Sequence, residues 1–180
     1  MGYKHTSMIS PAMFREFMLP RYKRLAQFVE EIGIPVLLLD CDGHVSQLIP
    51  LWIEAGIFGT FPTELAAGNN PVAYRKQYGN KMAIFGGIDK RAIRSKEQTY
   101  EEVMSRVPWL IEQGGFLPSI DHAVPPDVHL RGYLICVNLS KPSSKVAQYP
   151  CRMTIWKLRK ALGLSNGCGP MSLRVNRITR

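Results

Sequence analysis

The chain has 180 residues, 46% of them hydrophobic, and a formal net charge of +9, which is enough for one domain with a buried core. No apolar run approaches the roughly 20 residues of a membrane-spanning helix, and the N-terminus lacks a signal-peptide pattern, so we expect a cytoplasmic protein without a membrane partner. Residues 1–141 hold 15 Lys and Arg against all 14 Asp and Glu, whereas residues 142–180 hold the other 8 Lys and Arg and no acid. Because the excess positive charge is confined to one end, we do not expect a nucleic-acid-binding protein.

Residues 10–32 carry the first helical pattern. Ser10 is a typical N-cap and Pro11 a typical first helical residue. Apolar residues then recur at three- and four-residue spacing up to about Ile32, which indicates an amphipathic helix. Pro20 lies inside this pattern and should kink the helix or split it into two segments.

From residue 36 onward a strand–helix unit repeats four times. The predicted strands are 36–40, 58–62, 82–85 and 116–120, and the helices that follow them are about 45–55, 70–78, 98–113 and 127–139. Such alternation indicates a parallel sheet. Four units make half of a (β/α)₈ barrel, while a doubly wound sheet would carry a G-x-G-x-x-G turn that this sequence lacks. The predicted fold class is therefore α/β, with a half TIM barrel over residues 1–141 and an irregular basic tail over residues 142–180.

The first strand, 36–40, is the most informative stretch. Its four consecutive apolar residues, 36–39, predict a strand that is buried on both faces. The run ends in Asp40 and Asp42, which lie on one face of the strand if the alternation continues. Cys41 then points to the other face, and we expect it to pack in the core.

Polar or glycine residues follow every predicted strand. The candidate site residues are Asp40, Asp42, Glu64, Gly86, Gly87, Asp89, Asp121 and His122. The carboxyl ends of parallel strands meet at one edge of a sheet, so we expect these residues to gather at one rim. Carboxylates in such a place could hold a metal, bind a cationic or N–H-donating substrate, or keep a proton for acid catalysis. The histidine could act as a ligand or as an acid/base, and each residue also has an ordinary structural interpretation.

Four motifs resemble one family in order and spacing. They are SPAMFREF at 10–17, LDCDG at 39–43, FGGID at 85–89 and DHAVPPD at 121–127. Together they are similar to the C-terminal half of the uroporphyrinogen decarboxylase superfamily over about residues 1–140. The resemblance implies a TIM barrel, in agreement with the strand–helix alternation.

The decarboxylase branch of that superfamily removes carboxylates from the acetate arms of a tetrapyrrole and uses no cofactor. Resemblance to it implies catalytic roles for His122, Asp40 and Asp42. It also implies substrate binding by Glu64, Gly86, Gly87, Asp89 and Asp121. His122 falls in the turn where these enzymes carry Gly-His-Gly, with Asp121 and Ala123 in place of the two glycines.

The other branch moves methyl groups between corrinoid proteins and thiols such as coenzyme M, and it binds zinc. Resemblance to it implies a metal site made by Asp40, Asp42 and His122, with a corrinoid protein as partner. An Asp/Asp/His set suits zinc less well than the His/Cys/Cys set of that branch.

The resemblance covers only one half of a barrel. Further substrate-binding residues of the family lie in the other half, so we expect either a homo-oligomer, pairing with a separate N-terminal half, or an inactive fragment that serves at most as an assembly partner. Residues 142–180 are predicted to contain a linker at 142–145 and a short basic helix at about 153–162. The alternative is a poorly ordered or out-of-frame extension.

Overall fold

The computed structural model describes residues 1–140. The predicted basic tail at 142–180, with its linker and short helix, lies outside the described residues. Within the described part, no helix combines the length and apolar character that crossing a membrane requires.

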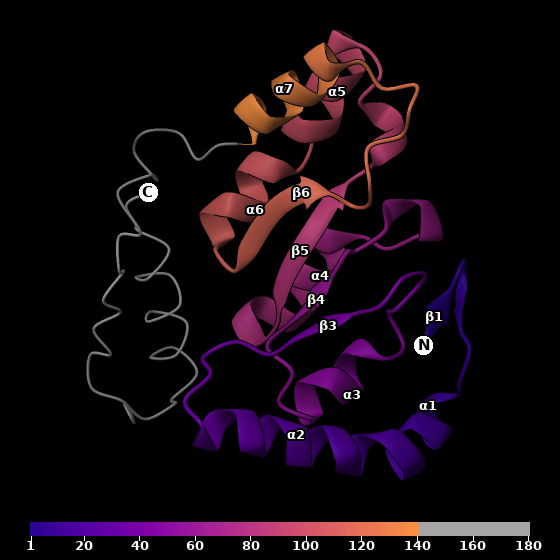
Figure 1. Cartoon of the computed structure of the whole chain (residues 1–180), viewed down its shortest axis with the longest axis vertical. Helices are drawn as coiled ribbons and strands as arrows, with labels where there is room; N and C mark the ends of the chain where they lie inside the picture. The colour runs from indigo at the N-terminus through magenta and orange to yellow at the C-terminus, as the bar shows by residue number, and fades with distance from the viewer. Residues whose placement is uncertain (141–180) are drawn as a thin grey trace, which may run out of the picture.

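The chain forms a leading helical segment followed by four strand–helix units (Figure 1). The elements are β1 (Gly2–Tyr3), β2 (Thr6–Ser7), α1 (Pro11–Met13), η1 (Phe14–Met18), α2 (Leu19–Glu31), β3 (Leu38–Asp40), α3 (Ile49–Glu54), β4 (Gly59–Phe61), η2 (Leu65–Ala67), α4 (Pro71–Tyr78), η3 (Gly79–Lys81), β5 (Ala83–Ile88), η4 (Lys90–Ala92), α5 (Lys96–Met104), α6 (Val107–Gln113), β6 (Phe116–Ile120) and α7 (Leu130–Leu139).

The central sheet is parallel, with strand order β3-β4-β5-β6. The register places Leu39 beside Thr60, Thr60 beside Ile84, and Ile84 beside Phe116. The predicted α/β fold with four consecutive parallel strands is therefore confirmed. Parallel order brings the carboxyl ends of all four strands to one edge of the sheet.

The hydrophobic core lies on one side of this sheet. Leu39 and Ile84 point to that side and pack with buried residues of α3 such as Trp52. The opposite face is more open, because Leu38 is 39% exposed and Leu117 is 55% exposed. The prediction that strand 36–40 is buried on both faces is therefore wrong. In the described residues, helices cover only one side of the strand.

Proline accounts for two interruptions of the predicted helices. The oxygen of Ser10 accepts a bond from the Met13 N–H at 3.1 Å, which confirms the predicted N-cap. The segment then passes through a π-helical turn, η1, before α2, whose second residue is Pro20. The predicted helix at 98–113 is two helices, α5 and α6, and Pro108 lies in the first turn of the second. Proline cannot donate the hydrogen bond that would continue a helix across these points.

A buried arginine joins two connections at the amino ends of the strands. The guanidinium of Arg75 donates to the carbonyl oxygens of Gly79, Met82 and Gly115, the last at 2.7 Å, and to the side-chain oxygen of Asn80 at 3.0 Å. Arg75 is only 4% exposed, and burial lowers the pKa of its guanidinium. It therefore ties the connection between α4 and β5 to the connection between α6 and β6.

Replacing this arginine tests how much the tie contributes. Arg75→Met keeps most of the side-chain volume but leaves the carbonyl oxygens of Met82 and Gly115 without this donor. We expect the free energy of unfolding to fall by about 3 kcal/mol, as measured by urea denaturation. Arg24→Met is the matched control, since Arg24 is exposed and should change stability by less than about 0.5 kcal/mol. Equal effects of the two substitutions would contradict a structural role for Arg75.

Candidate functional site

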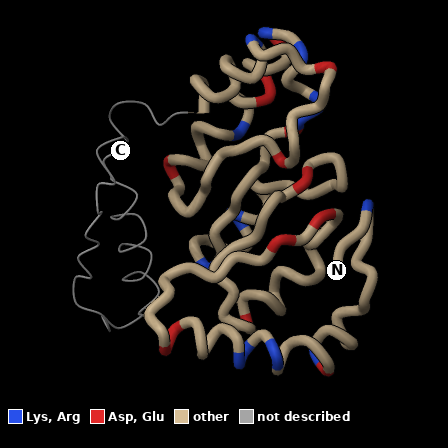
Figure 2. The backbone as a smooth tube through the Cα atoms, viewed as in Figure 1, with Lys and Arg blue, Asp and Glu red and all other residues tan. Residues whose placement is uncertain are grey.

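The loops that follow the four strands carry the candidate site. β3 leads into Asp42, β4 into Glu64, β5 into Asp89, and β6 into Asp121 and His122. Figure 2 shows acidic positions along several of these loops, while many of the basic positions lie on the helices. The parallel strands thus bring these residues to the same edge of the sheet.

Asp121 is the best-anchored carboxylate of the rim. Its side chain is fully buried. One oxygen accepts the backbone N–H of Leu65 at 3.3 Å, and the other accepts the backbone N–H of Lys90 at 3.4 Å. Asp121 therefore connects the end of β6 to the turns that follow β4 and β5. Burial raises the pKa of this carboxyl, although the hydrogen bond and charge of Lys90 and the nearby His122 oppose the shift.

His122 lies between two carboxylates. Its Nε2 is 3.1 Å from Oδ1 of Asp42, and its Nδ1 is 3.6 Å from Oδ1 of Asp121. The Nδ1 atom is buried and has no hydrogen-bond partner within the described part of the chain. Asp42 is well exposed, with 66% of its side chain accessible. The imidazole therefore has one edge against a buried carboxyl and the other against an exposed one.

The position of the proton follows from the chemistry of these groups. An ionised carboxylate only accepts hydrogen bonds, so Nε2 of His122 carries the hydrogen that faces Asp42. The second proton of the group can reside on Nδ1 or on Asp121, but the 3.6 Å between Nδ1 and Oδ1 is too long for a hydrogen bond. A buried carboxyl with a raised pKa can keep that proton at a higher pH than an exposed one. The arrangement can hold and release a proton.

A buried asparagine, which no sequence pattern predicted as a site residue, sets the position of the neighbouring loop. The side-chain oxygen of Asn69 accepts from the Val45 N–H at 3.1 Å and from the Tyr74 hydroxyl at 2.7 Å. Its side-chain nitrogen donates to the carbonyl oxygens of Gly43 and Glu64, each at 2.8 Å. The loop after β3 is thereby fixed to the loop after β4. A single polar residue in an unpatterned loop carries no sequence signal for such a role.

Glu64 and Asp89 are both engaged within the rim. A carboxylate oxygen of Glu64 accepts the Gly43 N–H at 3.1 Å. Asp89 accepts from the backbone N–H of Arg91 at 2.8 Å and from its guanidinium at 2.7 Å. Burial alone would raise the pKa of Asp89, but the hydrogen bonds and charge of Arg91 leave it lowered. Asp89 is thus held in an ion pair with Arg91.

Gly86 and Gly87 have structural reasons to be glycine. Both have positive φ, at 93° and 74°. A Cβ on Gly86 would lie 1.7 Å from the carbonyl oxygen of Pro62, and a Cβ on Gly87 would lie 3.2 Å from the ring of Phe116. Gly86 therefore allows the segment after β4 to approach β5 closely, and Gly87 leaves room for the ring of Phe116 in β6. Their role in substrate binding stays a prediction.

Asp40 and His44 stand apart from the group around His122. Asp40 is exposed, and in residues 1–140 no hydrogen bond or ion pair joins it to the other rim residues. The ring of His44 is 3.1 Å from the Ala67 carbonyl oxygen and 2.6 Å from the Ser46 hydroxyl, so it is engaged in local structure. Cys41 is buried in the core, as predicted, and its sulfur accepts the Gly2 N–H.

The predicted metal set is not assembled in the described residues. Among residues 1–140, no three His, Cys, Asp or Glu side chains are placed so that they could hold one ion together. Asp42 and His122 are close, but they bind each other, and Asp40 lies outside their contact. The donor geometry therefore does not fit a three-ligand zinc site.

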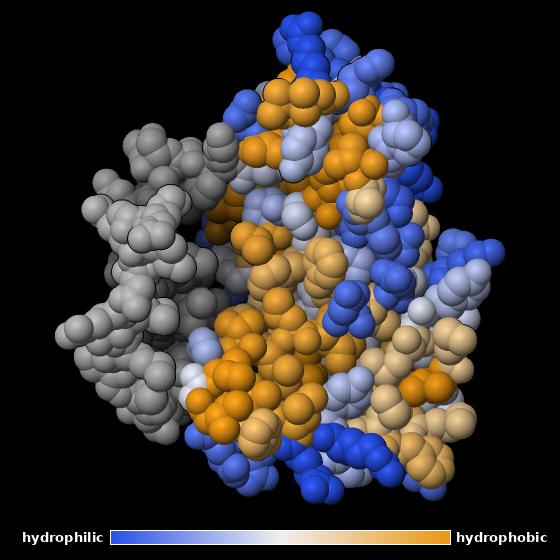
Figure 3. Space-filling model, in the orientation of Figure 1, coloured by the Kyte–Doolittle hydropathy of each residue, from blue (hydrophilic) through white to orange (hydrophobic). Residues whose placement is uncertain are grey.

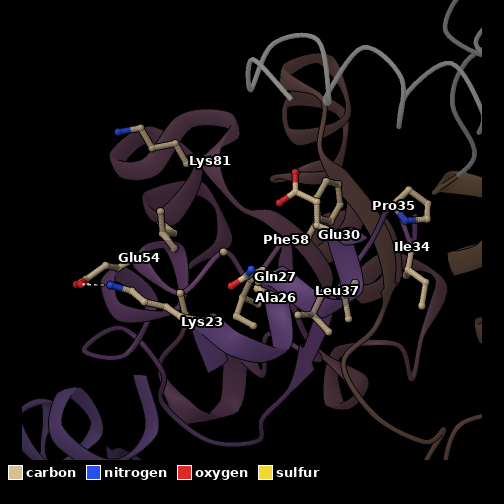
Figure 4. Close-up of a pocket in the computed structure, with 15 residues that line it drawn as sticks. Lys23, Ala26, Gln27, Glu30, Ile34, Pro35, Leu37, Glu54, Phe58 and Lys81 are labelled. Atoms are coloured by element: carbon tan, nitrogen blue, oxygen red, sulfur yellow. Dashed lines mark hydrogen bonds and ion pairs between the residues drawn. The ribbon is translucent and has the colours of Figure 1, made fainter. Parts of the chain in front are cut away.

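A separate groove lies at the other end of the strands. It has a volume of about 490 Å³ and lies between α2, α3 and the segments that precede β3 and β4. Apolar residues such as Leu37 and Phe58 line it, and Lys23 at its rim pairs with Glu54 at 3.0 Å (Figure 4). The groove lies at the amino ends of β3 and β4, away from His122, so we do not assign the chemistry of the rim to it.

Two adjacent asparagines provide a matched test of how the rim is held. Asn69→Asp removes both side-chain donors and places a carboxylate against two carbonyl oxygens. We expect a loss of about 3 kcal/mol in the free energy of unfolding, measured in urea at pH 7. Asn70 is the N-cap of α4 and uses only its oxygen, so Asn70→Asp should change stability by less than about 0.5 kcal/mol. A stable Asn69→Asp protein would show that the four bonds do not set the rim.

The buried carboxyl at position 121 should also make stability depend on pH. Its pKa is raised in the folded state, so the folded chain binds a proton more readily than the unfolded chain. This group then stabilises the fold increasingly as the pH falls from neutral toward its ordinary value of about 3.9. We expect the stability difference between wild type and Asp121→Asn to shift in favour of wild type from pH 7 to pH 5. Parallel pH profiles of the two proteins would contradict this assignment.

Comparison with known proteins gives a consistent family assignment. The family model described as uroporphyrinogen decarboxylase (URO-D) matches residues 4–140. The chain is 34% identical over 134 residues to a methylated-thiol--coenzyme M methyltransferase of Methanosarcina mazei, covering 72% of this chain and 34% of that protein. It is 23% identical over 134 residues to a uroporphyrinogen decarboxylase of Danio rerio, covering 69% of this chain and 34% of that protein. No solved structure matches the chain significantly.

The chain thus spans about a third of the length of these curated relatives. The matched segment includes every strand of the parallel sheet and every candidate residue of the rim. The resemblance found in the four motifs is confirmed, and the chain belongs to the uroporphyrinogen decarboxylase (URO-D) family.

Proposed function

We propose that this chain supplies the proton-transfer part of a site that decarboxylates a tetrapyrrole of the uroporphyrinogen type. The observation that carries the proposal is the position of His122 between the buried Asp121 and the exposed Asp42. A histidine held in this way can give a proton to a substrate and take one back near neutral pH. Similarity to the uroporphyrinogen decarboxylase of Danio rerio supports the choice of substrate class.

The proposed reaction begins with protonation of a pyrrole ring. Nε2 of His122 carries the hydrogen at the exposed edge of the group, where Asp42 now accepts it. A substrate at the rim would receive this proton at a ring carbon, either directly or through Asp42. The positively charged ring then accepts the electron pair of the breaking carbon–carbon bond as CO₂ leaves the acetate arm. A proton added to the remaining methylene and one lost from the ring complete the reaction.

The carboxylates of the rim suit this substrate class. Asp42 and Glu64 lie near each other on the loops after β3 and β4 and offer acceptor oxygens. Pyrrole N–H groups are donors, so they complement such a rim. Arg91, whose pKa is raised mainly by Asp89 and further by Asp121 and Glu64, places a positive charge at the rim that could attract a substrate carboxylate. Because the chain spans a third of its relatives, the activity of a whole enzyme is part of the proposal.

A second candidate function is methyl transfer to a thiol. The higher identity to the methyltransferase of Methanosarcina mazei favours it. Methyl transfer would require a metal ion at the rim and a corrinoid protein as partner. The donor geometry of Asp40, Asp42 and His122 does not support the metal, so we place this function second. The third alternative is that the chain is an inactive fragment or an assembly partner, in which case the residues of the rim would have no catalytic role.

The test of the proposed function is substitution of the histidine. His122→Gln can still donate to Asp42 through its side-chain amide but cannot move a proton. We expect decarboxylation of uroporphyrinogen, followed as CO₂ release by the 180-residue chain, to fall by about 100-fold or more. Because His122 is only partly buried, the far-ultraviolet circular dichroism of the variant should match that of wild type.

The matched control is His129→Gln. His129 is exposed and makes no capping bond with its side chain at the start of α7, so activity should be unchanged. Equal activity of His122→Gln and wild type would overturn the proposal. Stoichiometric zinc in the purified chain, lost on His122→Ala, would favour methyl transfer. Absence of turnover in a folded wild-type chain would favour the inactive fragment.

A further inference from the structure

The open face of the sheet is apolar. Leu38, Phe61 and Leu117 are 39%, 37% and 55% exposed, and the register places Phe85 beside Leu117. In the space-filling view, hydrophobic residues gather over the strands and beside them (Figure 3). A contiguous apolar surface of this kind on a monomer usually marks an interaction site.

The sheet also has two free edges. In the described part of the chain, β3 pairs only with β4, and β6 pairs only with β5. The outward backbone groups of an edge strand are ready to pair with another strand. Both edges belong to one parallel sheet, so a strand added to either edge in the same direction would continue it.

The helix beside the β3 edge carries an apolar stripe on its outer side. Leu25 and Phe28 of α2 and Ile32, which caps its end, are 44%, 55% and 53% exposed. By the 3.6-residue period they lie on the side of α2 away from Lys23, whose amine pairs with Glu54 of α3. This stripe therefore faces away from the neighbouring helix of the same chain.

The helix beside the β6 edge, α7, also carries an exposed apolar stripe. Leu130, Leu134 and Val137 of α7 are 70%, 49% and 37% exposed. The same period puts them on the side opposite Gly132 and Cys136, the residues that α7 buries as it packs on α5. Figure 1 shows α2 and α7 at opposite ends of the molecule, with the sheet between them.

We propose that two copies of this chain close into one eight-stranded barrel around a two-fold axis parallel to the strands. β3 of each copy would pair with β6 of the other, and α2 of each would pack against α7 of the other. A two-fold axis in this direction keeps all eight strands parallel, and it satisfies both edges, both helix stripes and the open face at once. The occupant of the surface is therefore a second copy of the chain.

The available area is large enough for a stable dimer. The large apolar side chains of the open face and the two stripes carry on the order of 150 Å² each and are about half exposed. They offer roughly 700 Å² per copy, close to the about 800 Å² that each partner contributes to a specific interface of standard size. Backbone pairing at two strand edges would add to this area.

The closed dimer also changes the site. β6 ends in Asp121 and His122, and the strand beside it would be β3 of the second copy, which ends in Asp40. Asp40, which no bond joins to the rim of its own chain in the described residues, would then lie next to His122 of the other copy. The dimer therefore completes a rim that one copy leaves open.

The test is the mass of the full 180-residue chain in solution, measured by light scattering during size-exclusion chromatography at about 50 μM. We expect twice the chain mass of 20.3 kDa. Phe28→Lys and Leu134→Glu should each raise the dissociation constant at least tenfold, because each puts an unpaired charge into the contact between α2 and α7. The double variant should return toward the wild-type constant, since each lysine then faces a glutamate of the other copy.

Tyr100→Lys is the matched control: Tyr100 is an exposed residue of α5 and belongs to none of the strands or stripes of the proposed contact, so the dimer should stay intact. A second measurement needs no variant: hydrogen exchange at the edge-strand amides of β3 and β6 should slow as concentration rises. A monomeric wild type, a dimer indifferent to both single variants, or a double variant as weak as the single ones would overturn the proposal. So would a chain that pairs only with a different βα polypeptide.

Discussion

The buried carboxylate of Asp121 is the interaction on which the rest of the rim depends. It accepts backbone hydrogen bonds from the turns after β4 and β5, and it belongs to the end of β6. Burying a carboxyl is costly, and the burial raises the pKa of Asp121 although the charge of Lys90 opposes the shift. The same group faces the imidazole of His122. The same side chain therefore joins the turns of the rim and has a raised pKa. Shifted pKa values of this kind are typical of functional sites.

The contact between Asp42 and His122 adds a constraint on the shape of the sheet. These residues follow β3 and β6, the first and last strands, which are not neighbours. Their side chains can meet at 3.1 Å only because the loops converge above the sheet. Asn69 keeps the first of these loops in place through its bonds to Gly43 and Val45. The site therefore depends on long-range loop positions more than on the strands themselves.

Much of the fold could be predicted from local pattern, because alternating apolar strands and amphipathic helices have few other ways to bury their surfaces. The N-cap at Ser10, the helix at α4 and the strand at β6 follow from residues that are neighbours in sequence. The exposure of Leu38 could not be predicted, since an apolar run does not say how many layers cover it. The four bonds of Asn69 could not be predicted either, because they join loops whose approach only the folded chain creates. Of the candidate site, the grouping of Asp42, Asp121 and His122 was foreseen, while the separate position of Asp40 was not.

The two relatives are named for different chemistry, and this chain covers 34% of the length of each. In this chain a fully buried aspartate precedes His122, and its raised pKa suits the proposed proton transfer. The Nε2 atom of His122 faces Asp42, whose side chain is exposed to solvent. In the proposed dimer, further strands on that side would exclude water from the pair and strengthen the interaction between the two side chains, so the proposed dimer would support the proposed proton transfer.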